Sequence, residues 1–206
     1  GFAATTLLAT GGFMLMPFGS AFAVHNLGIT LEQLPLVYMV TGISTMIAGP
    51  LLGRLTDSVG KYPVFVAGSV LSSVLVIVYT NWGVTPLWTV IALNTVLFIG
   101  ITSRMISSSA LTSAVPAPAD RGAFMGINSS VAKLSGGIAS AVAGMIVVQG
   151  ADGKLAHYPT LGYVVVASMA ITVWMMFYID RMVQRQPHGM HTPPPDPEFA
   201  ATDIPS

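Results

Sequence analysis

Long apolar stretches alternate along this chain with short polar or proline-bearing breaks. A membrane-spanning helix needs about 20 mostly apolar residues, and six stretches meet that requirement: 4–24, 34–53, 62–82, 87–106, 122–148 and 162–179. Runs such as 70–78 show none of the period-two alternation that a membrane β-barrel requires. The pattern therefore predicts an all-α membrane protein with six transmembrane helices in a lipid bilayer.

Composition agrees with this class. Apolar residue types make up 53% of the chain and charged types only 8%, which is too few for a water-facing shell. The formal net charge is zero, so no basic surface for nucleic acid is expected. The last segment, 187–206, differs because it is rich in proline and poor in residues that could build a core. We expect a disordered tail there, after a six-helix region at 1–186.

The positive charges fall unevenly on the two sides of the predicted membrane region. With the segment between the second and third helices placed inside, that side receives Arg54, Lys61, Arg104, Arg121, Arg181 and Arg185. Lys154 falls on the other side, and Lys133 lies within a helix. Because cytoplasmic loops carry the excess of Lys and Arg, both ends of the chain are expected in the cytoplasm.

The break at 53–61 is the most distinctive one, with the sequence Gly-Arg-Leu-Thr-Asp-Ser-Val-Gly-Lys. Its glycines permit a tight turn and close approach of another backbone. The carboxylate of Asp57 is suited to accept hydrogen bonds from the free N–H groups at the start of a neighbouring helix. We predict a charged loop that contacts a helix end. An ordinary charged turn between two helices is the alternative.

Some positions inside the predicted spans carry residues that disturb a helix or that lipid disfavours. Pro17 removes a backbone donor and should kink the first helix. The kink either serves packing or marks a helix that lines a substrate pathway. Asn94 and Asn128 are polar residues within the fourth and fifth helices. Together with Pro17, they are candidate cavity residues.

Two cations also lie within or near the spans. Arg104 either extends its guanidinium to the headgroups, or pairs with Asp57 or with a carboxylate outside this chain. Lys133 would cost roughly 2.5–3.5 kcal/mol in mid-membrane, so it should face a cavity or reach the inner interface. The carboxylates all lie at helix ends, in loops or in the tail. A proton carrier would therefore involve Lys133 or a part of the protein outside this chain.

The sequence offers no set of residues for catalysis or metal binding. It contains no cysteine, and its histidines lie outside the predicted spans: His25, His157, His188 and His191. Zinc sites need clustered His, Asp, Glu or Cys ligands, and a nucleotide-hydrolysing site needs a Gly-rich phosphate loop, which is missing. We expect no enzyme, no metal and no cofactor, with a proton gradient as the energy source.

Two segments carry a resemblance to a known family. The pattern Gly-x-Leu-x-Asp-x-x-Gly-Lys at 53–61 resembles the cytoplasmic loop signature of the major facilitator superfamily. The passage Arg-Gly-Ala-Phe-Met-Gly-Ile-Asn-Ser-Ser-Val-Ala-Lys-Leu-Ser-Gly-Gly at 121–137 looks like the fifth-helix entrance of the second half in bacterial drug and arabinose-type efflux permeases. Residues 1–186 therefore resemble the carboxyl-terminal half of a twelve-helix carrier. The amino-terminal half of the same chain is expected to be missing.

The resemblance implies proton-coupled efflux of a small molecule, such as a drug or sugar, by alternating access in a bacterial inner membrane with a cytoplasmic tail. It also implies a cytoplasmic gate motif made of Gly53, Arg54, Leu55, Asp57, Gly60 and Lys61. Candidate charge partners of this motif are Arg104, Asp120 and Arg121. Ser58 and Tyr62 depart from the family pattern, which often has basic residues there. An uptake symporter and a non-transporting membrane scaffold or receptor are the alternatives.

Overall fold

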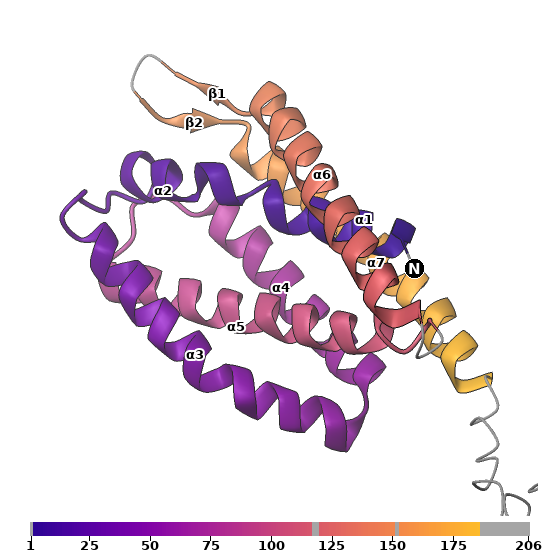
Figure 1. Ribbon diagram of the computed structural model, residues 1–206. Coiled ribbons are helices and arrows are strands. Elements are labelled where there is room, and N and C mark those ends of the chain that lie inside the picture. Colours follow the sequence, from indigo (N-terminus) through magenta and orange to yellow (C-terminus); the bar gives the residue numbers. More distant parts are fainter. Residues whose placement is uncertain (1, 117–119, 151–152, 186–206) are drawn as a thin grey trace, which may run out of the picture.

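The structure is a computed structural model that describes residues 2–116, 120–150 and 153–185. In these ranges the chain forms helices and a short hairpin (Figure 1): α1 Phe2–Phe13, α2 Met16–His25, α3 Leu34–Val59, α4 Lys61–Asn81, α5 Leu87–Thr112, α6 Arg121–Ile146, β1 Val148–Gln149, β2 Leu155–Ala156 and α7 Tyr158–Arg185. Six of the described helical stretches can cross a membrane by length and composition, with α1 and α2 forming the first. The predicted all-α membrane protein with six spanning helices is confirmed. The tail expected at 187–206 lies outside the described residues.

The first span is broken near its middle. α1 ends at Phe13 and α2 begins at Met16, with Pro17 in the first turn of α2. Proline is tolerated there because the N–H that it lacks would have no acceptor within the helix. The Phe18 N–H donates to the Leu15 carbonyl at 3.3 Å, which starts the new helix. The chain therefore forms two helices where the sequence predicts one kinked helix.

The segment 53–61 is not the loop that the sequence predicts. α3 continues to Val59 and α4 begins at Lys61, so Gly60 alone separates them. The φ angle of Gly60 is +112°, which residues with a side chain rarely adopt. Thr56 holds the last turns of α3 in place, since its hydroxyl lies 3.3 Å from that of Ser107 in α5. The prediction was wrong because it ended the helix where apolar residues end, although a helix can continue beyond the lipid.

Two other helices also extend beyond the apolar stretches. α5 reaches Thr112, although the predicted span is 87–106. α7 covers Tyr158–Arg185, although the predicted span is 162–179. Their extra turns carry polar and charged residues, which is compatible with a helix that leaves the hydrocarbon region and enters the headgroup layer.

The helices pack in two groups that α7 joins (Figure 1). α5 packs against α3 and α4, α1 packs against α6, and α7 contacts both α4 and α1. The approach of α4 to α5 is close, because a Cβ added to Gly68 would lie 3.1 Å from the Gly100 carbonyl oxygen. Two glycines of α3 have no such neighbour in the described part of the chain. A Cβ at Gly49 or Gly53 would meet nothing within 4 Å.

One end of the bundle is closed by the hairpin. β1 and β2 pair antiparallel, with Gln149 opposite Leu155. The Asn26 side chain holds β2 through two hydrogen bonds: its amide donates to the Leu155 carbonyl at 3.3 Å, and its oxygen accepts from the Leu155 N–H at 3.0 Å. Nearby, the rings of Phe22 and Tyr158 stack with centroids 4.1 Å apart. These contacts connect the end of α2 to the start of α7.

Candidate functional site

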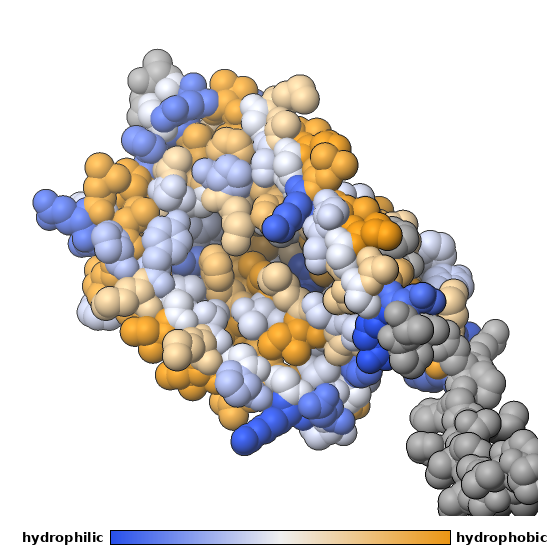
Figure 2. Space-filling view, in the orientation of Figure 1, coloured by the Kyte–Doolittle hydropathy of each residue, from blue (hydrophilic) through white to orange (hydrophobic). Residues whose placement is uncertain are grey.

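One face of the bundle is hollowed between α5 and α6. Figure 2 shows this hollow, with hydrophilic residues at its edge and on its floor. α3 and α6 border the same face and have the smallest buried fractions of the described spans, 11% and 17%, whereas α4 reaches 44%. Polar and ionisable groups inside membrane spans commonly mark pathways for solutes or protons. The polar residues of α5 and α6 are therefore the first candidates for function.

Arg104 of α5 is enclosed by the bundle, with 3% of its surface exposed. Its Nε donates to the Ser69 hydroxyl of α4 at 3.0 Å, and its guanidinium carbon lies 5.8 Å from the centre of the Phe65 ring. Its Nη2 has no hydrogen-bond partner among the described residues, and no described carboxylate forms an ion pair with it. The side chain thus neither reaches the headgroups nor pairs with Asp57. Of the possibilities that the sequence analysis gave for Arg104, pairing with a carboxylate outside this chain is the one that remains.

Lys133 lies at the middle of the 26-residue α6, and its side chain is exposed. About 18 Å of helix separate it from Arg121 at the start of α6. That distance exceeds half of the hydrocarbon thickness, which is about 30 Å in all. The position favours the cavity arrangement over the one in which the ammonium group reaches the inner interface.

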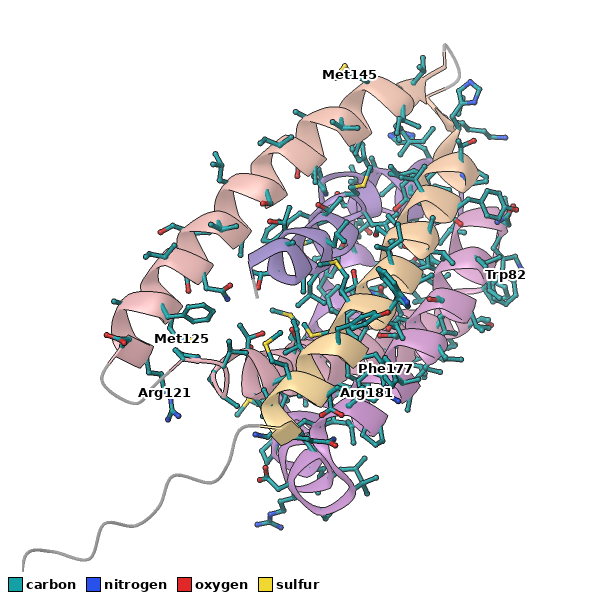
Figure 3. The ribbon with its side chains drawn as sticks, turned by 90° about the vertical axis from the view of Figure 1, so that its right-hand side faces the viewer. Trp82, Arg121, Met125, Met145, Phe177 and Arg181 are labelled. Carbon is teal, nitrogen blue, oxygen red and sulfur yellow. The ribbon has the colours of Figure 1, made fainter. Side chains whose placement is uncertain are left out.

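The surface of α6 divides into three faces at 100° per residue. The face toward α1 is buried and made of small residues: Gly136, Ala139 and Ala143. A second face exposes large apolar side chains: Ile127, Leu134, Ile138 and Met145. Figure 3 shows Met145 pointing away from the rest of the bundle. The third face, called the small-residue face below, is also exposed and consists of Gly126, Ser130, Lys133 and Gly137.

Two of the other candidate cavity residues, Asn94 and Asn128, take part in helix packing. The Asn128 side-chain oxygen accepts a hydrogen bond from the Thr5 hydroxyl at 2.7 Å, which links α6 to α1. The Asn94 amide donates to the Thr41 hydroxyl at 3.4 Å, which links α5 to α3, and Asn94 is buried. Pro17 is exposed at the break between α1 and α2. The structure therefore gives both asparagines a packing contact, which does not require a solute.

Residues 1–202 match the family model described as Major Facilitator Superfamily. The chain belongs to the major facilitator superfamily. The comparisons with curated proteins and with solved structures found no match. Membership in this superfamily makes the chain an integral, multi-pass membrane protein of a transporter family, and members of that family are generally not enzymes.

The segment that resembles the superfamily loop signature lies at the join of α3 and α4. Gly53, Arg54, Leu55 and Asp57 lie on the last turns of α3, Gly60 forms the turn, and Lys61 starts α4. Asp57 is exposed and makes no hydrogen bond or ion pair within the described part of the chain. The helix-end contact predicted for Asp57 is therefore absent from these residues.

The three candidate charge partners do not meet the signature. Arg104 is bonded to Ser69 instead. Asp120 and Arg121 are exposed at the start of α6. In Figure 3, Arg121 points away from the bundle at the same end of the molecule as Arg181. The structure thus does not join these residues to the segment 53–61.

A polar strip between α4 and α5 escaped prediction from the sequence. It is buried and consists of Ser69, Ser72, Ser103, Arg104, Ser107 and Ser108. Ser72 lies against Gly100, because a Cβ on that glycine would be 2.6 Å from the serine hydroxyl oxygen. The signal in the sequence is the i, i+3 and i, i+4 spacing of serine and glycine on both helices, which places them on one face of each helix.

Proposed function

We propose that this chain is one half of a secondary active transporter that exports a small molecule, such as a drug or sugar, by proton-coupled alternating access. The observation that carries the proposal is the hollow on the face that α3 and α6 border, together with an exposed lysine at the middle of α6. A superfamily transporter needs a solute site near mid-membrane between two repeats. The depth of Lys133 in α6 suits such a site.

The proposal assigns the other half of the site to a missing amino-terminal half of the same protein. α3 and α6 would contact that half, which would account for their small buried fractions. The broken first span supports a pathway at this face, because interrupted helices in membranes are tolerated where they line a cavity or pack on protein. Pro17 lies at that break.

The same proposal places the protein in a bacterial inner membrane with its tail in the cytoplasm. Arg54, Lys61, Arg121 and Arg181 lie near the ends of helices that share one side of the bundle. That side is assigned to the cytoplasm by the preference of cytoplasmic segments for Lys and Arg. The proton gradient is the proposed energy source, with Lys133 as the one titratable side chain that the described mid-membrane region exposes.

The first experiment compares the full-length parent with its Asp57→Asn variant in a bacterium that lacks its major efflux pumps. Drug susceptibility and proton-coupled efflux are measured at equal membrane abundance. We expect the parent to give resistance or efflux and the Asp57→Asn variant to lose it. Ser58→Ala is the matched control, because Ser58 is exposed on the same turn and its hydroxyl bonds only to a carbonyl of its own helix.

Three results would contradict parts of the proposed function. Accumulation of the solute inside the cell, in place of export, would favour an uptake symporter. Full activity in Asp57→Asn would remove the gate role from this carboxylate. No flux of any tested solute with a correctly inserted parent would favour a membrane scaffold or receptor.

A further inference from the structure

The spans of this chain carry positive charge without negative charge. Arg104 lies inside α5 and Lys133 inside α6, whereas the described carboxylates lie at helix ends or between helices: Glu32, Asp57, Asp120 and Asp180. The end of α5 and the start of α6 share one side of the membrane, since a single short segment joins them. Along the helices, Arg104 lies about 12 Å from the end of α5 and Lys133 about 18 Å from the start of α6. Both cations thus lie within their helices and not at the helix ends.

Lys133 has open space around it. A Cβ added at Gly126 or Gly137 on the same small-residue face would meet nothing within 4 Å in the described part of the chain. The large apolar side chains of α6 lie on a different face, the one suited to lipid. Lysine in hydrocarbon is costly, so the small-residue face is better suited to a polar space than to lipid.

Arg104 is the second cation within the described spans. Its charge is buried, and its Nη2 atom lacks a hydrogen-bond partner among the described residues. Charges in a poorly polarisable interior act over longer distances than charges in water. A hollow of one sign of charge with low-dielectric walls concentrates the opposite ion. Positive charge inside the bundle, without a described carboxylate to offset it, therefore favours an anion.

We propose that Lys133 binds the carboxylate of a small organic acid in this hollow, with Arg104 adding to the positive potential. The proposal rests on the proposed transport function for the presence of a solute, and it narrows the solute to an anion. A carboxylate on another part of the full-length protein could supply the same chemistry. The two sources differ in whether Lys133 is already neutralised before a solute arrives.

The first measurement reports the electrostatic potential near Lys133 and does not require the protein to transport a solute. This chain has no cysteine, so Ser130→Cys can serve as a reporter in the full-length parent after any cysteine elsewhere is replaced by serine. Ser130 lies three residues before Lys133 and is exposed. The rate of its reaction is compared for a sulfonate-bearing and a trimethylammonium-bearing methanethiosulfonate. We expect the anionic-to-cationic rate ratio to fall at least about tenfold in Lys133→Gln.

Two matched variants make the result specific. Lys133→Arg should keep the ratio, because it keeps the charge. Lys154→Gln removes a lysine from the turn between β1 and β2 and should leave the ratio unchanged. An equal ratio with and without Lys133 would overturn the proposal, since it would mean that a carboxylate of the protein already neutralises this lysine.

The second measurement tests whether an organic acid binds near Lys133. Succinate and gluconate are tested for protection of the same cysteine, beside their uncharged counterparts succinamide and sorbitol. Protection by the acids alone, lost in Lys133→Gln, would support the proposal. No protection by either acid, or equal protection by the uncharged compounds, would overturn it. Because both measurements work on a carrier that is not turning over, they can succeed or fail independently of the efflux assay.

Discussion

At the scale of single residues, Arg104 is the least expected feature of the described chain. A buried arginine usually pairs with a carboxylate, because removing an ion from water costs several kcal/mol that an opposite charge must offset. Here a serine hydroxyl and an aromatic ring take that place. The incomplete pairing makes the neighbours of Arg104 important for stability.

Substitutions at this contact should have opposite effects. Ser69→Ala leaves the buried Nε without its acceptor, so the free energy of unfolding should fall by about 1–3 kcal/mol. Arg104→Met removes the charge together with the unpaired group and should leave stability unchanged or raised. Thermal unfolding of the detergent-solubilised full-length protein measures both. Equal losses in the two variants would show that the pair acts through shape alone.

At the scale of helices, close packing depends on which glycines face a neighbour. Gly68 of α4 and Gly100 of α5 face each other, whereas Gly49 of α3 faces open space in the described structure. Small residues let membrane helices approach closely, but the sequence alone does not tell which small residues contact another helix. The small residues of α3 look no different in the sequence from those of α4 and α5.

The two kinds of glycine should respond differently to a methyl group. Gly68→Ala must push apart the α4–α5 pair, because its Cβ would meet a backbone oxygen, and we expect a loss of about 1–3 kcal/mol. Gly49→Ala should be neutral or slightly stabilising, since alanine is the better helix former. Melting curves of the two variants test this. A larger loss at Gly49 would indicate that another part of the protein packs there.

The hairpin between α6 and α7 gives a second prediction at this scale. Asn26→Ala removes both hydrogen bonds to Leu155, so amide exchange in β1 and β2 should become faster while exchange in α4 and α5 stays unchanged. Hydrogen exchange with mass spectrometry resolves these segments. Asn81→Ala is the control, since Asn81 is exposed and its hydrogen bonds, to the Ile77 carbonyl and from the Tyr163 hydroxyl, do not involve the hairpin. Faster exchange in all helices would mean global destabilisation instead.

Part of this architecture could be read from the sequence. The six apolar runs predicted the six spans because lipid imposes one length and one composition on all of them. The join of α3 and α4 was misread as a loop, since only Gly60 needs a special backbone angle there. The buried position of Arg104 could not be foreseen, because it depends on which residues of α4 face α5, and no local pattern fixes that.

At the scale of the whole molecule, the uncovered face of α3 and α6 sets an expectation for the chain by itself. We expect the 206-residue chain to insert into membranes but not to move a solute against a gradient, because the proposed site needs a second half of the carrier. Reconstitution of the purified chain in vesicles, beside the full-length parent, measures this. Concentrative transport by the chain alone would contradict the proposed two-half site.

The single residue between α3 and α4 has a mechanical consequence. A connector of several residues would absorb the tilt of one helix, but Gly60 leaves no slack between Val59 and Lys61. A displacement of the end of α3 therefore also displaces the first turn of α4, because only one residue separates the two helices. Inserting two glycines after Gly60 would lengthen this connection, so α3 and α4 could then move independently of each other.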